Sequence, residues 1–126
     1  MHLCTCTDTV ADCSRNHGTL LFVPKLPTAI TFLNFSYNDV QAITNDNFFL
    51  NVTSITGLEL SFNKLANINT QAFGLVSGLT ALYLHGNKLQ KFPDTCNGGV
   101  SIFPRLQVLE LSQNNIQSPS GLDVLT

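Results

Sequence analysis

Apolar side chains recur at fixed places in four short windows of this chain, each reading apolar-x-x-apolar-x-apolar-x-x-Asn-x-apolar. The windows are 30–40 (ITFLNFSYNDV), 55–65 (ITGLELSFNKL), 79–89 (LTALYLHGNKL) and 106–116 (LQVLELSQNNI), so their starts are 25, 24 and 27 residues apart. Alternation of apolar and polar residues within each window predicts a short strand with one buried face. Because one short strand cannot bury that face alone, the four should stack into a parallel sheet with a shared core.

A period of 24 to 27 residues with this consensus is typical of leucine-rich repeats. The predicted fold is an α/β leucine-rich repeat solenoid, a horseshoe fragment with short parallel strands on the concave face and irregular loops or short helical turns on the convex face. We expect a disulfide cap over residues 1–29 and repeats over 30–126, with starts near 30, 55, 79 and 106 and a truncated fifth repeat near 119–126.

The two ends of the chain also carry expectations. No signal peptide precedes the first cysteine, so Met1 is interpreted as an added start residue of a mature or trimmed chain. No cysteine cap follows the last repeat, which indicates a piece of a longer ectodomain. Such an end would expose apolar side chains, so we expect self-association, end to end, through Leu111, Ile116, Leu122 and Leu125.

An asparagine stands at the same place in every window. A buried amide at that place can satisfy backbone groups of its own turn and of the neighbouring turn. The sequence therefore predicts a structural asparagine ladder, and a ligand site made of these residues is a much weaker alternative. Its members are Asn38, Asn63, Asn87 and Asn114.

Aromatic and aliphatic residues between the windows also follow the repeat. Phe49 and Phe73 each stand six residues before the next window and should fill the convex side as a phenylalanine spine. Ile43, Ile68 and Phe92 each lie three residues past a window and are expected in the core.

Composition indicates an extracellular protein. Charged residues make up 11% of the 126 residues, against about 25% in an average soluble domain. Asn34-Phe-Ser36 and Asn51-Val-Thr53 are N-glycosylation sequons, and two of them in such a chain favour secretion. A glycan on Asn34 would lie on the concave face and one on Asn51 on the convex side.

Several function classes find little support. The net charge is −2 and the six basic residues form no run, so we do not expect nucleic-acid binding. The sequence has no run of about 18 apolar residues, no Gly-x-Ser-x-Gly motif and no phosphate loop. We expect neither a catalytic activity nor a cofactor. The one candidate for a catalytic group is a reactive thiol at Cys6.

Three of the four cysteines, in the spacing Cys4-x-Cys6-x6-Cys13, precede the first repeat. A small disulfide cap that shields the end of the solenoid is the favoured interpretation. Zinc held by these cysteines with His17 is a minor alternative. Cys96 should lie about three strand spacings of ~4.8 Å from the cap, beyond the ~7 Å Cα limit for a disulfide. It should therefore be free or pair outside this chain. One of the three cap cysteines is then left without a partner.

The cysteine spacing, together with Val10-Ala-Asp-Cys13-Ser14 and Leu26-Pro27-Thr28-Ala-Ile30, resembles the start of a Toll-like receptor ectodomain. The resemblance implies a disulfide between Cys4 and Cys13 and leaves Cys6 without a partner. It also implies an extracellular pattern-recognition module of an innate immune receptor, with a protein or microbial ligand. The parent protein would be a single-pass membrane receptor of the cell surface or the endosome.

The resemblance has a departure and two rivals. Arg15 and Tyr37 stand where RNA-sensing members of that family carry ligand histidines, so RNA binding does not carry over. The cap and repeats are also similar to those of the antigen-binding variable lymphocyte receptors and of structural leucine-rich repeat proteins of the extracellular matrix.

Outward strand residues would make the binding surface. The candidates are Glu59, Tyr83, His85 and Glu110, of which Tyr83 is of a type enriched at interfaces. An ordinary hydrated sheet face is the alternative. We expect His85 to be a solvated surface residue rather than a pH sensor.

Overall fold

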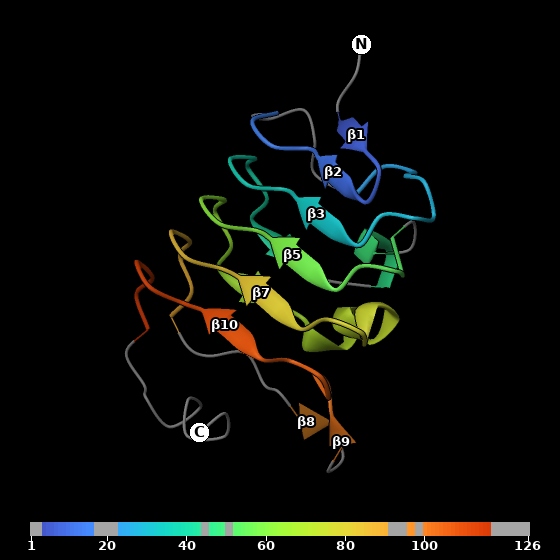
Figure 1. The fold of residues 1–126 in the computed structure, drawn as a ribbon. Helices are drawn as coiled ribbons and strands as arrows, with labels where there is room; N and C mark the ends of the chain where they lie inside the picture. The colour runs from blue at the N-terminus through green and yellow to red at the C-terminus, as the bar shows by residue number, and fades with distance from the viewer. Residues whose placement is uncertain are drawn as a thin grey trace.

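The computed structural model describes residues 4–16, 23–43, 46–49, 52–90, 96–97 and 100–116. Its main element is a six-stranded sheet in which the strands lie side by side down the molecule (Figure 1). In spatial order these are β1 (Thr5–Thr7), β2 (Val10–Asp12), β3 (Phe32–Asn34), β5 (Gly57–Glu59), β7 (Ala81–Tyr83) and β10 (Val108–Glu110).

Strand direction follows the repeat. β1 runs antiparallel to β2, and every later neighbour in the sheet is parallel. β3, β5, β7 and β10 each fall inside one of the four sequence windows. Since parallel strands need a crossover between them, each repeat must return behind the sheet before it contributes the next strand. The predicted leucine-rich repeat solenoid is therefore confirmed.

The middle residue of each strand points into the core. Register places Ala11, Leu33, Leu58, Leu82 and Leu109 opposite one another along the sheet. The first four are at most 1% exposed, whereas Leu109, in the last strand of the sheet, is half-buried. The apolar side chain two residues later is also buried in each of the first four repeating turns, at Cys13, Phe35, Leu60 and Leu84.

The return segments carry the remaining short elements (Figure 1). β4 (Ala42–Ile43) pairs in parallel with β6 (Asn67–Ile68), and β8 (Cys96–Asn97) pairs antiparallel with β9 (Val100–Ser101). The helical turns are 3-10 helices, η1 (Asp46–Phe49) and η2 (Thr70–Val76). None of the helices in the described ranges is long and apolar enough to cross a bilayer.

A phenylalanine spine fills the space between the sheet and these segments. Phe49 and Phe73 are at most 1% exposed, and their ring centroids are 4.9 Å apart. Phe48 packs on Phe49 at 4.9 Å, and Phe103 continues the row beyond Phe73 at 5.1 Å. Contacts at these distances are favourable edge-to-face or tilted pairs.

The other predicted core residues differ in their burial. Ile43 is 1% exposed. Ile68 is only half-buried, because it packs against the core from its rim in the two-residue strand β6. Ile68 therefore contacts the core, as expected, but lies at its edge. Phe92 lies outside the described residues.

Candidate binding face and the turns that position it

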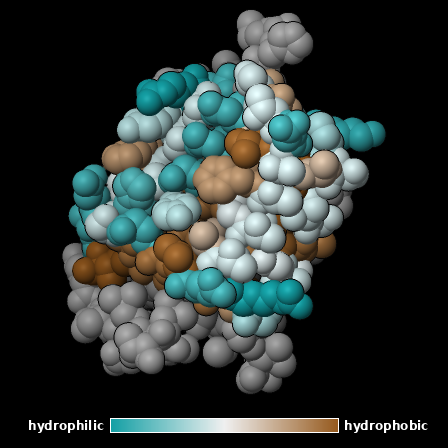
Figure 2. All heavy atoms as spheres, in the orientation of Figure 1, coloured by the Kyte–Doolittle hydropathy of each residue, from teal (hydrophilic) through white to brown (hydrophobic). Residues whose placement is uncertain are grey.

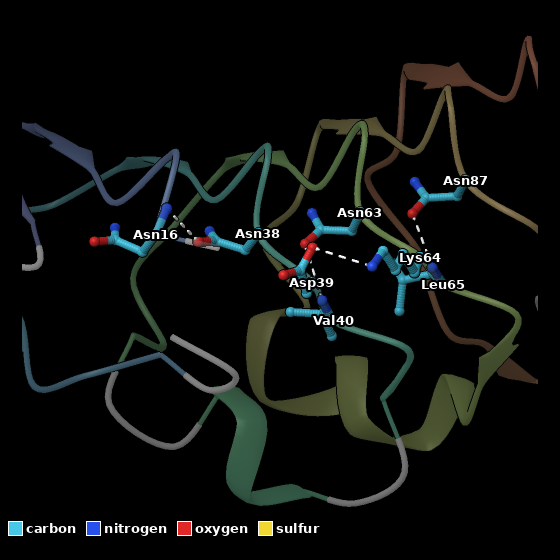
Figure 3. Close-up of polar contacts among 8 residues, drawn as sticks. All are labelled: Asn16, Asn38, Asp39, Val40, Asn63, Lys64, Leu65 and Asn87. Atoms are coloured by element: carbon cyan, nitrogen blue, oxygen red, sulfur yellow. Dashed lines mark hydrogen bonds and ion pairs between the residues drawn. The ribbon is translucent and has the colours of Figure 1, made fainter. Parts of the chain in front are cut away.

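Buried asparagines hold the turn that follows each strand (Figure 3). Asn63 is typical: its Nδ2 donates to the carbonyls of Leu60 (3.0 Å) and Phe35 (3.0 Å), and its Oδ1 accepts from the Val40 N–H (3.2 Å). One amide thus binds its own turn and the turn of the preceding repeat. The same three kinds of bond recur at Asn38, Asn87 and Asn114.

A further asparagine in the cap precedes these four. The Asn16 N–H donates to Asn38 Oδ1 at 2.8 Å, and Asn16 Nδ2 donates to the Cys13 carbonyl at 2.9 Å. Asn16 was not predicted from the sequence, because the cap lacks leucines at the repeat positions. The signal was present, however: Ala11-x-Cys13-x-x-Asn16 reproduces the apolar-x-apolar-x-x-Asn part of the pattern. β2 is thus built like a repeat strand.

Outward-pointing residues of β2, β3, β5, β7 and β10, with the turn residues just beyond, form what we call the strand face, the predicted concave face. Strand register arranges it in three rows across the five strands. The apolar row is Val10, Phe32, Gly57, Ala81 and Val108; the middle row is Asp12, Asn34, Glu59, Tyr83 and Glu110; the serine row is Ser14, Ser36, Ser61, His85 and Ser112.

Carboxylates of the middle row are held by the serines two residues further on. Glu59 Oε1 accepts from the Ser61 N–H at 3.1 Å, and Glu110 Oε1 accepts from the Ser112 N–H at 2.9 Å. Asp12 makes the same bond to Ser14 at 3.0 Å. These bonds satisfy turn N–H groups and fix the position of negative charge on the strand face.

Glu110 has a perturbed acidity. The Ser112 backbone N–H, then the Ser112 side chain and the charge of His85, lower the pKa of the Glu110 carboxyl. Hydrogen bonds to a carboxylate favour its charged form. These contacts therefore stabilise the negative charge of Glu110 on the strand face.

His85 is anchored on both sides. Its Nδ1 lies 2.8 Å from Ser61 Oγ, and its ring meets Phe62 edge-on with centroids 4.9 Å apart. His85 is thus a half-buried residue of the surface, and the neighbouring turn supplies both contacts. The residue types of a hydrolytic triad occur together here, as Ser61, His85 and Glu110. Ser61 is only 1% exposed, however, so a substrate cannot reach its hydroxyl.

The residue before each ladder asparagine has a left-handed backbone. Arg15, Tyr37, Phe62 and Gln113 have φ between 57° and 64°, and the fifth position is Gly86 with φ 73°. Bulky residues rarely adopt this conformation. Four of the five backbone N–H groups, those of Arg15, Tyr37, Phe62 and Gly86, donate to a carbonyl of the next turn, at 2.9 to 3.2 Å.

Side chains at these positions stack along the edge of the strand face. The Arg15 guanidinium lies 4.3 Å above the Tyr37 ring, and Tyr37 stacks on Phe62 at 4.8 Å. A Cβ at Gly86 would lie 2.5 Å from Phe62 Cδ1, so only glycine leaves room for that ring. Arg15 and Tyr37, noted above as departures from RNA-sensing receptors, thus take part in one packed row.

The cap cysteines separate into a pair and a free thiol. Cys4 and Cys13 form a disulfide, and Cys6 is exposed and unpaired. The disulfide removes two of the thiolates that the zinc alternative required, and the described residues contain no group of three or more potential metal ligands. His17 and the side chain of Cys96 lie outside the described part.

The remaining candidates are placed as follows. Asn34 is half-buried in the middle row, and its Oδ1 accepts from the Ser36 N–H (3.1 Å) and hydroxyl (2.7 Å). Leu111 and Ile116 are half-buried. Asn51, Leu122 and Leu125 fall outside the described residues.

Known proteins share both sequence and fold with this chain. The Leucine Rich Repeat family model matches residues 105–125. Osteomodulin of Rattus norvegicus is 37% identical over 73 residues, covering 56% of this chain and 17% of that protein. Epiphycan of Mus musculus is 27% identical over 114 residues (90% and 32%), and opticin of Canis lupus familiaris is 28% identical over 120 residues (95% and 33%).

A solved structure supports the fold alone. The Drosophila melanogaster SNF/U2A′ complex contains a chain that superposes with a TM-score of 0.64 at 20% identity, over 92% of this chain and 65% of that one. The chain spans about a sixth to a third of the length of the three relatives named above. The stacked repeats, the turns held by asparagines and the similarity to these proteins lead to one conclusion. The chain contains a leucine-rich repeat domain.

Proposed function

We propose that this domain is part of an extracellular matrix protein and that it binds a protein partner through the strand face. The observation that carries the matrix assignment is the similarity to epiphycan and opticin over 90% and 95% of the chain, and to osteomodulin over 56% of it. These relatives are leucine-rich proteins of the extracellular matrix. The Cys4–Cys13 disulfide fits an oxidising compartment.

The strand face has the chemistry of a protein-binding surface. Val10 and Val108, at its two ends, are 39% and 44% exposed, and Tyr83 stands between Glu59 and Glu110 in the middle row. On the side seen in Figure 2, apolar and hydrophilic residues are intermixed. Such a mixture is typical of surfaces that bind proteins. The three carboxylates of the middle row would repel the phosphates of a nucleic acid, so a nucleic acid is not proposed as the partner.

A Toll-like receptor ectodomain is the second candidate. It is favoured by one feature, the cap segment Val10–Ser14 with its Cys4–Cys13 pairing. The repeat relatives favour the matrix protein, because all three named above are matrix proteins and none is an immune receptor. A microbial ligand and a membrane-anchored parent protein belong to this second candidate only.

Retention on a cell-derived matrix tests the main proposal. The purified chain should be retained on decellularised matrix, and protease treatment of the matrix should abolish retention. Val108→Asp places a charge on the exposed end of the apolar row and should reduce retention about tenfold. Ala66→Asp, at an exposed return-segment position, is the matched control and should leave retention unchanged.

Each outcome bears on one part of the proposal. Equal retention of the wild type and both variants would remove the strand face as the binding surface. No retention of the wild type, together with binding to a microbial extract, would favour the Toll-like receptor candidate.

Secretion gives a separate test of the extracellular assignment. Expressed behind a secretory signal in mammalian cells, the chain should carry glycans at Asn34 and Asn51. Asn34→Gln and Asn51→Gln should each remove one glycosidase-sensitive step in gel mobility. Absence of glycan from both sequons of the secreted chain would show that neither is used, and the sequons would no longer support the extracellular assignment.

A further inference from the structure

We propose that His85 is a pH-responsive switch that decides which group accepts the hydrogen bond of the Ser61 hydroxyl. When His85 is neutral, the hydroxyl donates to its Nδ1; when His85 is protonated, the hydroxyl donates to the Glu59 carboxylate. This inference goes beyond the proposed function and needs no partner on the strand face. The sequence predicts a solvated His85 rather than a pH sensor, but the contacts of its ring in the structure support a switch.

Serines that follow a carboxylate in this fold bond back to it in a recurring way. In the cap, Asp12 Oδ1 accepts from both the N–H (3.0 Å) and the hydroxyl (2.6 Å) of Ser14. In the last described turn, the Glu110 carboxylate likewise accepts from the N–H of Ser112 at 2.9 Å and from its side chain. The carboxylate two residues before the serine is therefore the ordinary acceptor for its hydroxyl.

Ser61 departs from this arrangement. Its N–H donates to Glu59 Oε1 at 3.1 Å, as in the other two turns, but its Oγ lies 2.8 Å from His85 Nδ1. Among the described residues, His85 is the hydrogen-bond partner of this hydroxyl. Ser61 is 1% exposed, and a buried hydroxyl donates its proton to a protein group. In the structure that group is Nδ1, and a second acceptor, the Glu59 carboxylate, is already bonded to the same residue.

The charge of the imidazole sets the direction of the bond between Ser61 and His85. A neutral imidazole has one donor and one acceptor nitrogen, whereas a protonated imidazole has two donors. With Nδ1 as the acceptor, neutral His85 carries its proton on Nε2. Once His85 is protonated, Nδ1 donates to Ser61 Oγ, and the hydroxyl proton needs another acceptor. The Glu59 carboxylate then takes the role that the carboxylates of the other two turns already have.

Charged groups surround His85 from both sides. Glu59 stands on β5 and Glu110 on β10, and the charge of His85 acts on the Glu110 carboxyl. The turns that follow β5 and β7 each carry an exposed lysine, Lys64 and Lys88. Two carboxylates therefore favour a positive charge on the ring, and the two lysines of the turns oppose it.

Protonation would change how two neighbouring repeats are joined. Histidine changes charge between about pH 5 and 8, so the switch operates in that range. The bond between the turns after β5 and β7 would become charge-assisted, and such bonds are shorter and stronger than neutral ones. Glu59, Ser61 and His85 would then form one continuous chain of hydrogen bonds.

Crystal structures of the chain at about pH 8 and about pH 5 test the switch directly. Ser61 Oγ should stay within about 3 Å of His85 Nδ1 in both. At the lower pH the distance from Ser61 Oγ to the nearer Glu59 carboxylate oxygen should shorten to about 2.5–3.0 Å, the range of an O–H···O bond. Nitrogen NMR should show the imidazole proton on Nε2 at the higher pH and on both nitrogens at the lower pH.

Matched variants separate the hydrogen-bond switch from a simple effect of charge. Ser61→Ala removes the hydroxyl but keeps the N–H that bonds to Glu59. It should abolish the preference of neutral His85 for the Nε2 tautomer. The Glu59 carboxyl carbon should also lose most of the chemical-shift change that accompanies protonation of His85. Ser14→Ala removes a hydroxyl that donates to Asp12 in the cap, and it should leave both signals unchanged.

Each outcome decides for or against the switch. A proton on Nδ1 of neutral His85, or a distance between Ser61 Oγ and Glu59 that is equal at the two pH values, overturns the proposal. So does a Glu59 response that Ser61→Ala leaves intact. The wild-type structures decide the question even if that variant does not fold. Retention on matrix tests the proposed function separately, so failure of one leaves the other standing.

Discussion

Replacement of Asn63 by alanine is the most direct test of how the solenoid is held together. Asn63 is 5% exposed, and its Oδ1 is the acceptor for the N–H of Val40, which is itself 2% exposed. Alanine leaves that N–H buried without this acceptor, at a cost of about 1–3 kcal/mol. The Phe35 and Leu60 carbonyls lose one donor each.

Those two carbonyls lose less than the N–H does. Phe35 O also accepts from Asn38, and Leu60 O also accepts from Asn87. Each keeps one ladder bond, so we expect no further full desolvation penalty. The free energy of unfolding should therefore fall by about 2–4 kcal/mol, a large part of the 5–15 kcal/mol that stabilises a typical domain.

Urea unfolding followed by far-ultraviolet circular dichroism measures this loss. Two variants provide the comparison. Asn114→Ala breaks the same kinds of bond in a half-exposed turn, where water can replace the amide, and should cost about 1 kcal/mol. Asn67→Ala removes an exposed asparagine outside the ladder and should stay within about 0.5 kcal/mol of the wild type. An Asn63→Ala variant as stable as Asn67→Ala would refute the reasoning.

Three further predictions concern the turn, the cap and the strand face. Gly86→Ala should destabilise the domain by about 1–3 kcal/mol in the same urea assay, because φ is 73° and the new Cβ meets the neighbouring ring. The double variant Cys4→Ala with Cys13→Ala removes the disulfide between cysteines nine residues apart and should lower the free energy of unfolding by about 2–3 kcal/mol. Its unfolding midpoint should no longer change when reductant is added. The pKa of Glu110 is lowered in the folded state, so its stabilisation is present above the unfolded pKa of about 4.3 and is lost as pH falls through the lower folded value; carbon NMR titration should show that depressed midpoint, and Ser112→Ala should raise it.

The sequence predicted the strands well because two physical constraints coincide there. Leu33, Leu58 and Leu82 must point inward, and the asparagine that follows each must bond both to its own turn and to a neighbouring one. Each constraint fixes residue type and spacing together. The pattern can therefore be recognised in a single sequence. The outward residues of the strand face follow from it, because they alternate with the inward ones.

The cap strand β2 was harder to predict, because residues other than leucine fill its inward positions. In β2 the inward positions are Ala11 and Cys13 instead of leucines, and the disulfide of Cys13 supplies part of the missing apolar volume. A pattern based on leucine overlooks this strand and with it Asn16. The position becomes visible only when burial, and not residue identity, defines the repeat.

The left-handed turn could not be predicted, because local preference opposes it. Tyrosine and phenylalanine disfavour positive φ by about 1–2 kcal/mol, yet Tyr37 and Phe62 both adopt it. Their backbone N–H groups donate to carbonyls of the next turn, and the asparagine beside each fixes the turn from within. The conformation is therefore imposed by neighbouring repeats, and the stacked rings recover part of its cost. Gln113 has the same φ in the last described turn, where Asn114 bonds the preceding repeat. A repeat should therefore lose this turn when the preceding repeat, to which its asparagine bonds, is removed.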